Sequence, residues 1–209
     1  MRRESHSHGR SGTVTVHKSP PPVYKRVVGG VWPPLDRESG GLKCARCPDS
    51  GMTNGASADA TAREVVHAGG HEHVTAEPGS TLEVTTDDWL TPAGDCILAV
   101  EADRAPADFD ESFVARCRDA DARIEAVIAV DPAGDWDDPA HATTVRGRGH
   151  PDLRFDDERG AVARTSDHVD GRTVMVDADA AAADLDRDLV AALAEGAELR
   201  LTLRVLAGE

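Results

Sequence analysis

The sequence predicts a mainly β domain with two helices, made of two copies of one unit in which three or four strands precede a helix and a last strand. The apolar stripe of the first helix, Phe109, Phe113 and Cys117, recurs as three leucines in the second half. Residues spaced by four share one face of a helix, so both helices present the same face to a core. Two copies with a period of nearly eighty residues predict one closed two-fold domain and not a solenoid of short repeats.

The expected strands follow the same order in the two halves. Upstream of the helices, residues 97–99 correspond to residues 174–176. Downstream, both halves alternate apolar and polar residues with period two, which is typical of strands with one buried face; the apolar positions are Ile124, Ala126, Ile128 and Val130, then Leu199, Leu201, Leu203 and Val205. We therefore expect one domain over residues 52–209, with repeats at about 63–130 and 141–206 and a Pro- and Gly-containing linker at 131–140. An α+β class is the alternative.

Residues 1–51 differ in composition from the rest of the chain. They carry nine basic and four acidic residues, all three lysines of the chain and the proline run 20–22. This composition is typical of linkers, and the change at Met52 favours a disordered or spurious extension of a protein that starts at Met52. Cys44 and Cys47 have half of a zinc-knuckle spacing, but a complete site needs two more ligands. We favour an accidental spacing over a metal site.

Residues 52–209 are strongly acidic. The whole chain has a net charge of −15, and residues 1–51 contribute +5, which leaves −20 on residues 52–209. This stretch has no lysine, so we expect a protein adapted to molar salt, where the Debye length falls to about 3 Å and screens self-repulsion. Such a charge disfavours nucleic-acid binding. Arg146 and Arg148 form the nearest approach to a basic cluster, and two arginines in one strand more often form local ion pairs.

The sequence also disfavours a membrane partner. No apolar run approaches the ~20 residues that cross a bilayer, and the start of the chain lacks the pattern of a signal peptide. We therefore expect a cytoplasmic protein.

Several short motifs resemble a known family in combination. They are Gly70-His71, Leu90-Thr91-Pro92, Arg148-Gly149-His150-Pro151-Asp152-Leu153 and Gly171-Arg172-Thr173. Together they resemble an archaeal domain of unknown function, family number 371, over residues 63–206. The resemblance implies a mainly β, sandwich-like fold and an archaeal source, which agrees with the high-salt composition. It implies no established activity.

His71 and His150 are the candidates that the repeat singles out, because each follows a glycine at the end of an expected strand. The common catalytic signatures, a Gly-x-Ser-x-Gly elbow, a phosphate loop and a dinucleotide fingerprint, are absent from the sequence. In a functional interpretation the two imidazoles converge near the two-fold axis and hold a metal or act on an anionic ligand. In the structural interpretation, which we favour, each ring caps a turn by bonding to a neighbouring carbonyl.

Further candidates carry charge. Asp95 and Arg172 occupy equivalent positions after a glycine. In one interpretation they are surface residues or form an ion pair between the halves. In the other they form a site, in which Arg172 binds a carboxylate or phosphate and Asp95, beside Thr91, takes a proton or a cation. Glu83 alternates with apolar residues on its strand, so its face is either solvated or lines a pocket. Arg148 completes the set of candidate ligand-binding residues.

Two classes of function stay open. A small-ligand or partner-binding module is favoured by the missing catalytic signatures and by the sandwich architecture that the resemblance implies. The alternative is a metal-assisted or acid/base enzyme acting on a small polar metabolite, with His71, His150 and Asp95 in the site. The sequence identifies no cofactor.

Overall fold

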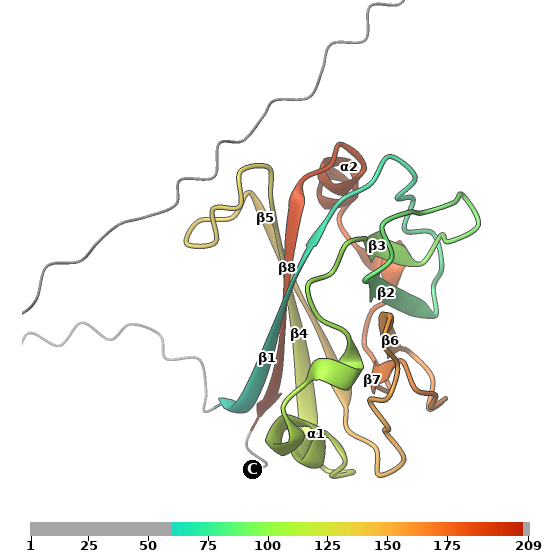
Figure 1. Cartoon of the computed structure of the whole chain (residues 1–209), viewed down its shortest axis with the longest axis vertical. Coiled ribbons are helices and arrows are strands. Elements are labelled where there is room, and N and C mark those ends of the chain that lie inside the picture. Colours follow the sequence, from blue (N-terminus) through green and yellow to red (C-terminus); the bar gives the residue numbers. More distant parts are fainter. Residues whose placement is uncertain (1–59, 207–209) are drawn as a thin grey trace, which may run out of the picture. The chain divides into compact units, whose positions relative to one another are not determined.

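The structure, a computed structural model, describes residues 60–206 (Figure 1). Within them, two four-stranded β-sheets and two short helices enclose one apolar core. The predicted mainly β class with two helices is therefore confirmed. The expectations for residues 1–51, including the Cys44 and Cys47 spacing, lie outside the described residues.

The first sheet, sheet A, has the strand order β1-β8-β4-β5, and every neighbouring pair is antiparallel. Its strands are β1 (Ala60–Gly69), β8 (Glu198–Leu206), β4 (Arg123–Asp131) and β5 (His141–Arg148). Side chains of a strand alternate between its two faces, so Ile124 of β4, Leu201 of β8 and every second residue from them lie in the core. The residues between them, such as Arg123 and Glu125, lie on the opposite, outer face of the sheet.

The second sheet, sheet B, has the order β3-β2-β6-β7. Its central strands, β2 (Thr81–Thr85) and β6 (Gly160–Arg164), are antiparallel to each other. The edge strand β3 (Ile97–Ala99) is parallel to β2, and the edge strand β7 (Thr173–Met175) is parallel to β6. Leu82 and Val84 belong to the same core cluster as Ile124 of sheet A. The two sheets therefore share one core, and each has an outer face directed away from it.

Each helix follows a single turn of 3-10 helix; the elements are η1 (Pro106–Asp108), α1 (Glu111–Cys117), η2 (Ala182–Asp184) and α2 (Arg187–Ala194). Asp110 caps α1 by accepting a hydrogen bond from the backbone N–H of Ser112. Phe109 precedes this cap with an extended backbone, so α1 begins later than the apolar stripe predicts. Its ring still packs edge-on against Phe113, with centroids 5.9 Å apart. No helix in the described range has the length and apolar character needed to cross a membrane.

The two halves contain the same elements in the same order, and the strand order of each sheet reads the same when the halves are exchanged. The backbone also matches at unusual positions. Ala76 and Phe155 are both left-handed, with φ of 52° and 54°. Descent of the halves from one duplicated unit stays a prediction, because a shared topology does not test ancestry.

One carboxylate organises the loop between β4 and β5, which spans residues 132–140. Asp131 accepts hydrogen bonds from the backbone N–H groups of Ala133 (2.8 Å), Asp135 (3.0 Å) and Ala140 (3.2 Å). These bonds favour the ionised form and hold the pKa of Asp131 below its usual range.

Candidate functional site

The outer face of sheet B carries a buried carboxylate. Leu82 and Val84 of β2 point into the core, so Glu83 lies on the opposite face, directly across from Val162 of β6. The sequence left open whether this face is solvated. The structure shows that Glu83 is only 8% exposed, so its carboxylate is largely removed from water.

Arg172 is the charged partner of Glu83. It precedes β7, and its Nη1 atom lies 3.4 and 3.5 Å from the two carboxylate oxygens. Its Nη2 atom lies 3.6 Å from the carboxylate of Asp170. Charge-assisted hydrogen bonds are usually about 2.7–2.9 Å long, so both contacts are loose. The structure thus brings two of the predicted site residues together, with a guanidinium that is not fully engaged.

A small cavity opens beside this pair. It has a volume of about 170 Å³, and its lining residues are Glu83, Thr85, Asp87, Asp157, Arg159, Gly160 and Arg172. A water molecule occupies roughly 30 Å³ of liquid, so the space corresponds to about five or six waters. Gly160 makes room for the carboxylate, because a Cβ atom there would lie 2.3 Å from Glu83 Oε1. We call this space the Glu83–Arg172 pocket.

The electrostatics of the pocket are unusual for a surface carboxylate. Burial raises the pKa of Glu83, although the Coulombic attraction of Arg172 opposes the rise. The thiol of Cys96 lies 3.7 Å from Glu83 Oε2. Burial also raises the pKa of this thiol, and the neighbouring Glu83 adds to the effect. A shifted carboxyl beside a charged partner in a cleft is a feature that clusters at functional sites.

The rim of the pocket is held by compensated charges. Arg159 donates two hydrogen bonds to Asp87, at 2.6 and 3.1 Å, and these bonds hold the pKa of Asp87 below its usual range. Asp157 accepts from the backbone N–H groups of Arg159 and Gly160, each at 2.8 Å. The rim is therefore preorganised, and Glu83 and Arg172 are the groups left to meet a ligand.

The two histidines occupy matching turns. Nδ1 of His71 accepts a hydrogen bond from the backbone N–H of His73, and Nδ1 of His150 accepts one from Asp152, each at 3.1 Å. Both rings cap a turn, as the structural interpretation expects, but the partner is an N–H group and not a carbonyl. Among residues 60–206, no group of three or more His, Cys, Asp or Glu residues could hold a metal ion. A metal shared by His71 and His150 stays a prediction.

The histidines have different surroundings. His150 lines an open cavity of about 560 Å³ together with Asp152, Asp167 and His168. The ring of His71 instead lies 5.1 Å from the ring of His73. Nothing in these contacts joins the two imidazoles into one site.

The remaining candidates are separate from the pocket. Thr91 is exposed, and its carbonyl oxygen closes a turn by accepting from Gly94 N–H at 2.9 Å. The carbonyl oxygen of Asp95 accepts from Glu77 N–H at 3.3 Å. Arg172 pairs with Glu83 and Asp170. An ion pair with Asp95 was one of the three alternatives that the sequence left open. Arg148 lies on β5 of sheet A.

Sequence reasoning missed Gly160, Asp157 and Cys96. The pairing of β2 with β6 brings Gly160 and Asp157 to Glu83, and the pairing of β2 with β3 on its other side brings Cys96. The alternation along β2 was the available signal, since it separated Glu83 from the core residues beside it.

Comparison with known proteins identifies the family. The family model described as a domain of unknown function (DUF371) matches residues 66–206, so the chain belongs to that family. An uncharacterised protein of the archaeon Methanocaldococcus jannaschii is similar to this chain. The two are 36% identical over 135 residues, which cover 65% of this chain and 93% of the relative. The resemblance inferred from the short motifs is therefore confirmed.

Proposed function

We propose that this DUF371 protein is a binding module for a compact polar ligand, which it holds in the Glu83–Arg172 pocket. The observation that carries the proposal is a buried carboxylate whose guanidinium partner is only loosely bonded and faces a cavity. Groups in this state gain more from a ligand than fully bonded surface charges do, because their hydrogen-bonding capacity is not filled.

The chemistry of the pocket defines the ligand. Glu83 accepts hydrogen bonds, so it fits an ammonium group or a hydroxyl donor. Arg172 donates, and its planar fork fits a carboxylate or a phosphate. A molecule that offers both groups within the space of about five or six waters is a small zwitterion or hydroxy acid. Free amino acids and small hydroxy acids are the ligand classes that match.

The fold alone does not require a carboxylate at this position. Val162 lies directly opposite Glu83 on the same face and is buried at 2% exposure, which shows that an apolar side chain fits the setting. Burying an ionised group costs stability unless it is paired and well bonded. The presence of Glu83 beside a loose partner therefore favours a role in binding over a role in stability.

An acid/base enzyme is the second candidate, now with Glu83 in place of the histidine pair. The raised pKa of Glu83 supports it, because a carboxyl works best as a proton carrier when its pKa approaches the working pH. Arg172 would orient an anionic substrate. Incubation of the ligand with the protein, followed by NMR, separates the two functions, since only an enzyme gives a product that disappears in Glu83→Gln.

A high-salt, cytoplasmic setting is part of the proposal. Residues 52–209 carry a net charge of −20 and no lysine, a composition that tolerates molar salt because self-repulsion is screened there. We also propose a small molecule as partner, with neither a membrane nor a nucleic acid.

The test is a thermal-shift screen of the full chain in molar potassium chloride, with free amino acids and small hydroxy acids as probes. We expect at least one probe to raise the Tm of the parent and not that of Glu83→Gln or Arg172→Gln. Asp152→Asn and Arg154→Gln are the matched controls, because they make the same charge changes on exposed residues outside the pocket and should keep the shift. No shift with any probe, or equal loss in the controls, contradicts the proposal.

A further inference from the structure

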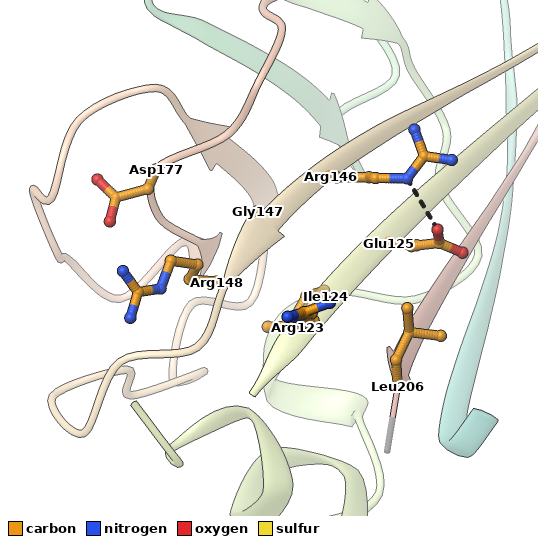
Figure 2. Close-up of a pocket in the computed structure, with 8 residues that line it drawn as sticks. All are labelled: Arg123, Ile124, Glu125, Arg146, Gly147, Arg148, Asp177 and Leu206. Carbon is orange, nitrogen blue, oxygen red and sulfur yellow. Dashed lines mark hydrogen bonds and ion pairs between the residues drawn. The ribbon is translucent and has the colours of Figure 1, made fainter. Parts of the chain in front are cut away.

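β5 is an edge strand of sheet A, so one side of its backbone has no strand of the sheet beside it. Near the end of β5 this side is covered. Arg148 exchanges two backbone hydrogen bonds with Val176, at 2.8 and 3.1 Å. The carbonyl oxygen of Arg146 accepts from Asp179 N–H at 2.8 Å, and Arg146 N–H donates to the carboxylate of Asp179 at 2.7 Å. Figure 2 shows Asp177, which belongs to the covering segment, beside the end of β5.

The middle of the same edge is open. The backbone groups of successive strand residues point alternately to the two sides of the strand. Because Arg146 directs its N–H and C=O groups away from β4, Thr144 and Ala142 do so as well. Among residues 60–206, no hydrogen bond from another segment covers these groups. Open N–H and C=O groups on an edge strand are a template for pairing with a further strand.

This part of β5 lacks the features that usually protect an edge. Residues 142–145 are Ala-Thr-Thr-Val, with no charge, and threonine and valine favour strands. Proteins block edge strands with charged side chains, prolines or bulges. The other edge strand of sheet A has such features, since β1 carries Arg63 and Glu64 in the equivalent stretch and a register shift between Ala60 and Ala62. β5 is therefore the less protected edge of the sheet.

The charges on the two sides of the open stretch are opposite. Asp138 precedes it in the β4–β5 loop, Arg146 and Arg148 follow it, and all three are exposed. Arg146 forms the local ion pair expected of it, with Glu125 at 3.0 Å. Arg148 only donates a long hydrogen bond of 3.4 Å to the carbonyl oxygen of Ala120. Within residues 60–206, neither Asp138 nor Arg148 forms an ion pair.

We propose that β5 pairs with β5 of a second copy of this chain, antiparallel and with Thr143 on the two-fold axis between the copies. This register places Ala142 of each copy opposite Thr144 of the other, so every open N–H and C=O group gains a partner. It also directs Arg148 of each copy toward Asp138 of the other. Charge complementarity therefore favours an antiparallel second copy over a parallel one, and the two sheets A join into one continuous sheet.

Sedimentation velocity of the full chain over a series of protein concentrations measures the proposed dimer. The buffer contains molar potassium chloride, because it screens the repulsion between two copies whose residues 52–209 each carry −20. We expect a monomer–dimer equilibrium in the parent. Thr144→Pro should raise its dissociation constant at least about tenfold, since proline has no N–H to donate and the change acts in both copies. Proline is tolerated where the N–H faces away from the sheet, so β5 should still pair with β4.

The matched control is Val65→Pro, the same change on the opposite edge of sheet A. The carbonyl oxygen of His67 accepts from Asp103 N–H at 2.9 Å, so the backbone groups of His67, and of Val65 two residues before it, face away from β8. This variant should dimerise as the parent does. Circular dichroism melts show whether both proline variants fold. If Thr144→Pro melts early, Thr144→Lys replaces it, because a lysine on an edge strand opposes pairing.

The register has a test of its own. Arg148→Glu should weaken the dimer, and the double variant Asp138→Arg, Arg148→Glu should recover at least part of the loss, because opposite charges then face each other again. Hydrogen exchange should show the amides of Ala142 and Thr144 gaining protection as the protein concentration rises. The proposal is overturned by a parent that stays monomeric at every concentration, an equal loss in Val65→Pro, no recovery in the charge-reversed variant, or protection that does not depend on concentration.

Discussion

Glu64 is a charged residue on the core face of β1, and its replacement gives the sharpest test of how this fold is stabilised. It is 4% exposed. Its carboxylate accepts a hydrogen bond from the guanidinium of Arg104 and another, of 2.6 Å, from the backbone N–H of Asp110. Because Asp110 caps α1, one carboxylate joins β1 to the start of that helix. Glu64→Ala leaves the N–H group of Asp110 and part of Arg104 without a partner.

The expected cost follows from these contacts. Breaking a buried ion pair by removing one partner costs about 3–5 kcal/mol. The side chain of Arg104 is 34% exposed, so water can hydrate its guanidinium once Glu64 is removed. The loss of stability should therefore lie at the low end of that range. We expect Glu64→Ala to lower the free energy of unfolding by about 3 kcal/mol, which is a fall of roughly 10 °C in Tm for a domain of this size.

Circular dichroism melts of the full chain measure this effect. The control is Asp156→Ala, because Asp156 pairs with Arg154 at 3.5 Å and both side chains are more than half exposed. Exposed pairs contribute about 0–1 kcal/mol, so the control should melt near the parent. If Glu64→Ala melts as high as Asp156→Ala, the carboxylate does not join β1 to α1 as we infer.

Three further outcomes follow from the structure. Burial raises the pKa of Glu83, so its stability contribution is fully present at acidic pH and is lost as pH rises through the folded-state pKa. The difference between the Tm of Glu83→Gln and that of the parent should therefore shift in favour of the variant as pH rises from the ordinary pKa of a glutamate, and a constant difference would contradict this. Burial raises the pKa of the Cys117 thiol to about 12, so peptide-resolved alkylation should label Cys117 only after unfolding, and later than Cys96. The net charge of −20 on residues 52–209 predicts a Tm that rises from millimolar to molar potassium chloride, and a flat response would remove the high-salt interpretation.

The regular elements could be predicted because their causes are local. The period-two runs of β4 and β8 and the helical stripe of Phe113 and Cys117 each follow from residues within one segment. Strand pairing has no such local cause. The sequence assigns Glu83 to the non-core face of β2, but only the antiparallel register with β6 brings Gly160 beside it, and only the approach to β7 brings Arg172.

The repeated Gly-His motif has a structural cause that the sequence alone did not reveal. A Cβ atom on Gly70 would lie 2.0 Å from the carbonyl oxygen of Leu193 in α2, and one on Gly149 would lie 2.3 Å from that of Cys117 in α1. Each glycine thus permits close packing against the helix end of the other half. The histidine that follows each of them caps the turn through Nδ1.

The glycine and histidine that match between the halves are therefore explained by packing and turn capping. Candidate ligand-binding residues are better looked for at equivalent positions where the two halves carry different residues. The offset that relates Gly70 to Gly149 also relates Glu83 to Val162, which are direct partners across β2 and β6. One half keeps an apolar residue there, and the other keeps a carboxylate that burial disfavours. This departure from symmetry, and not the symmetric histidines, marks the surface most worth testing for ligands.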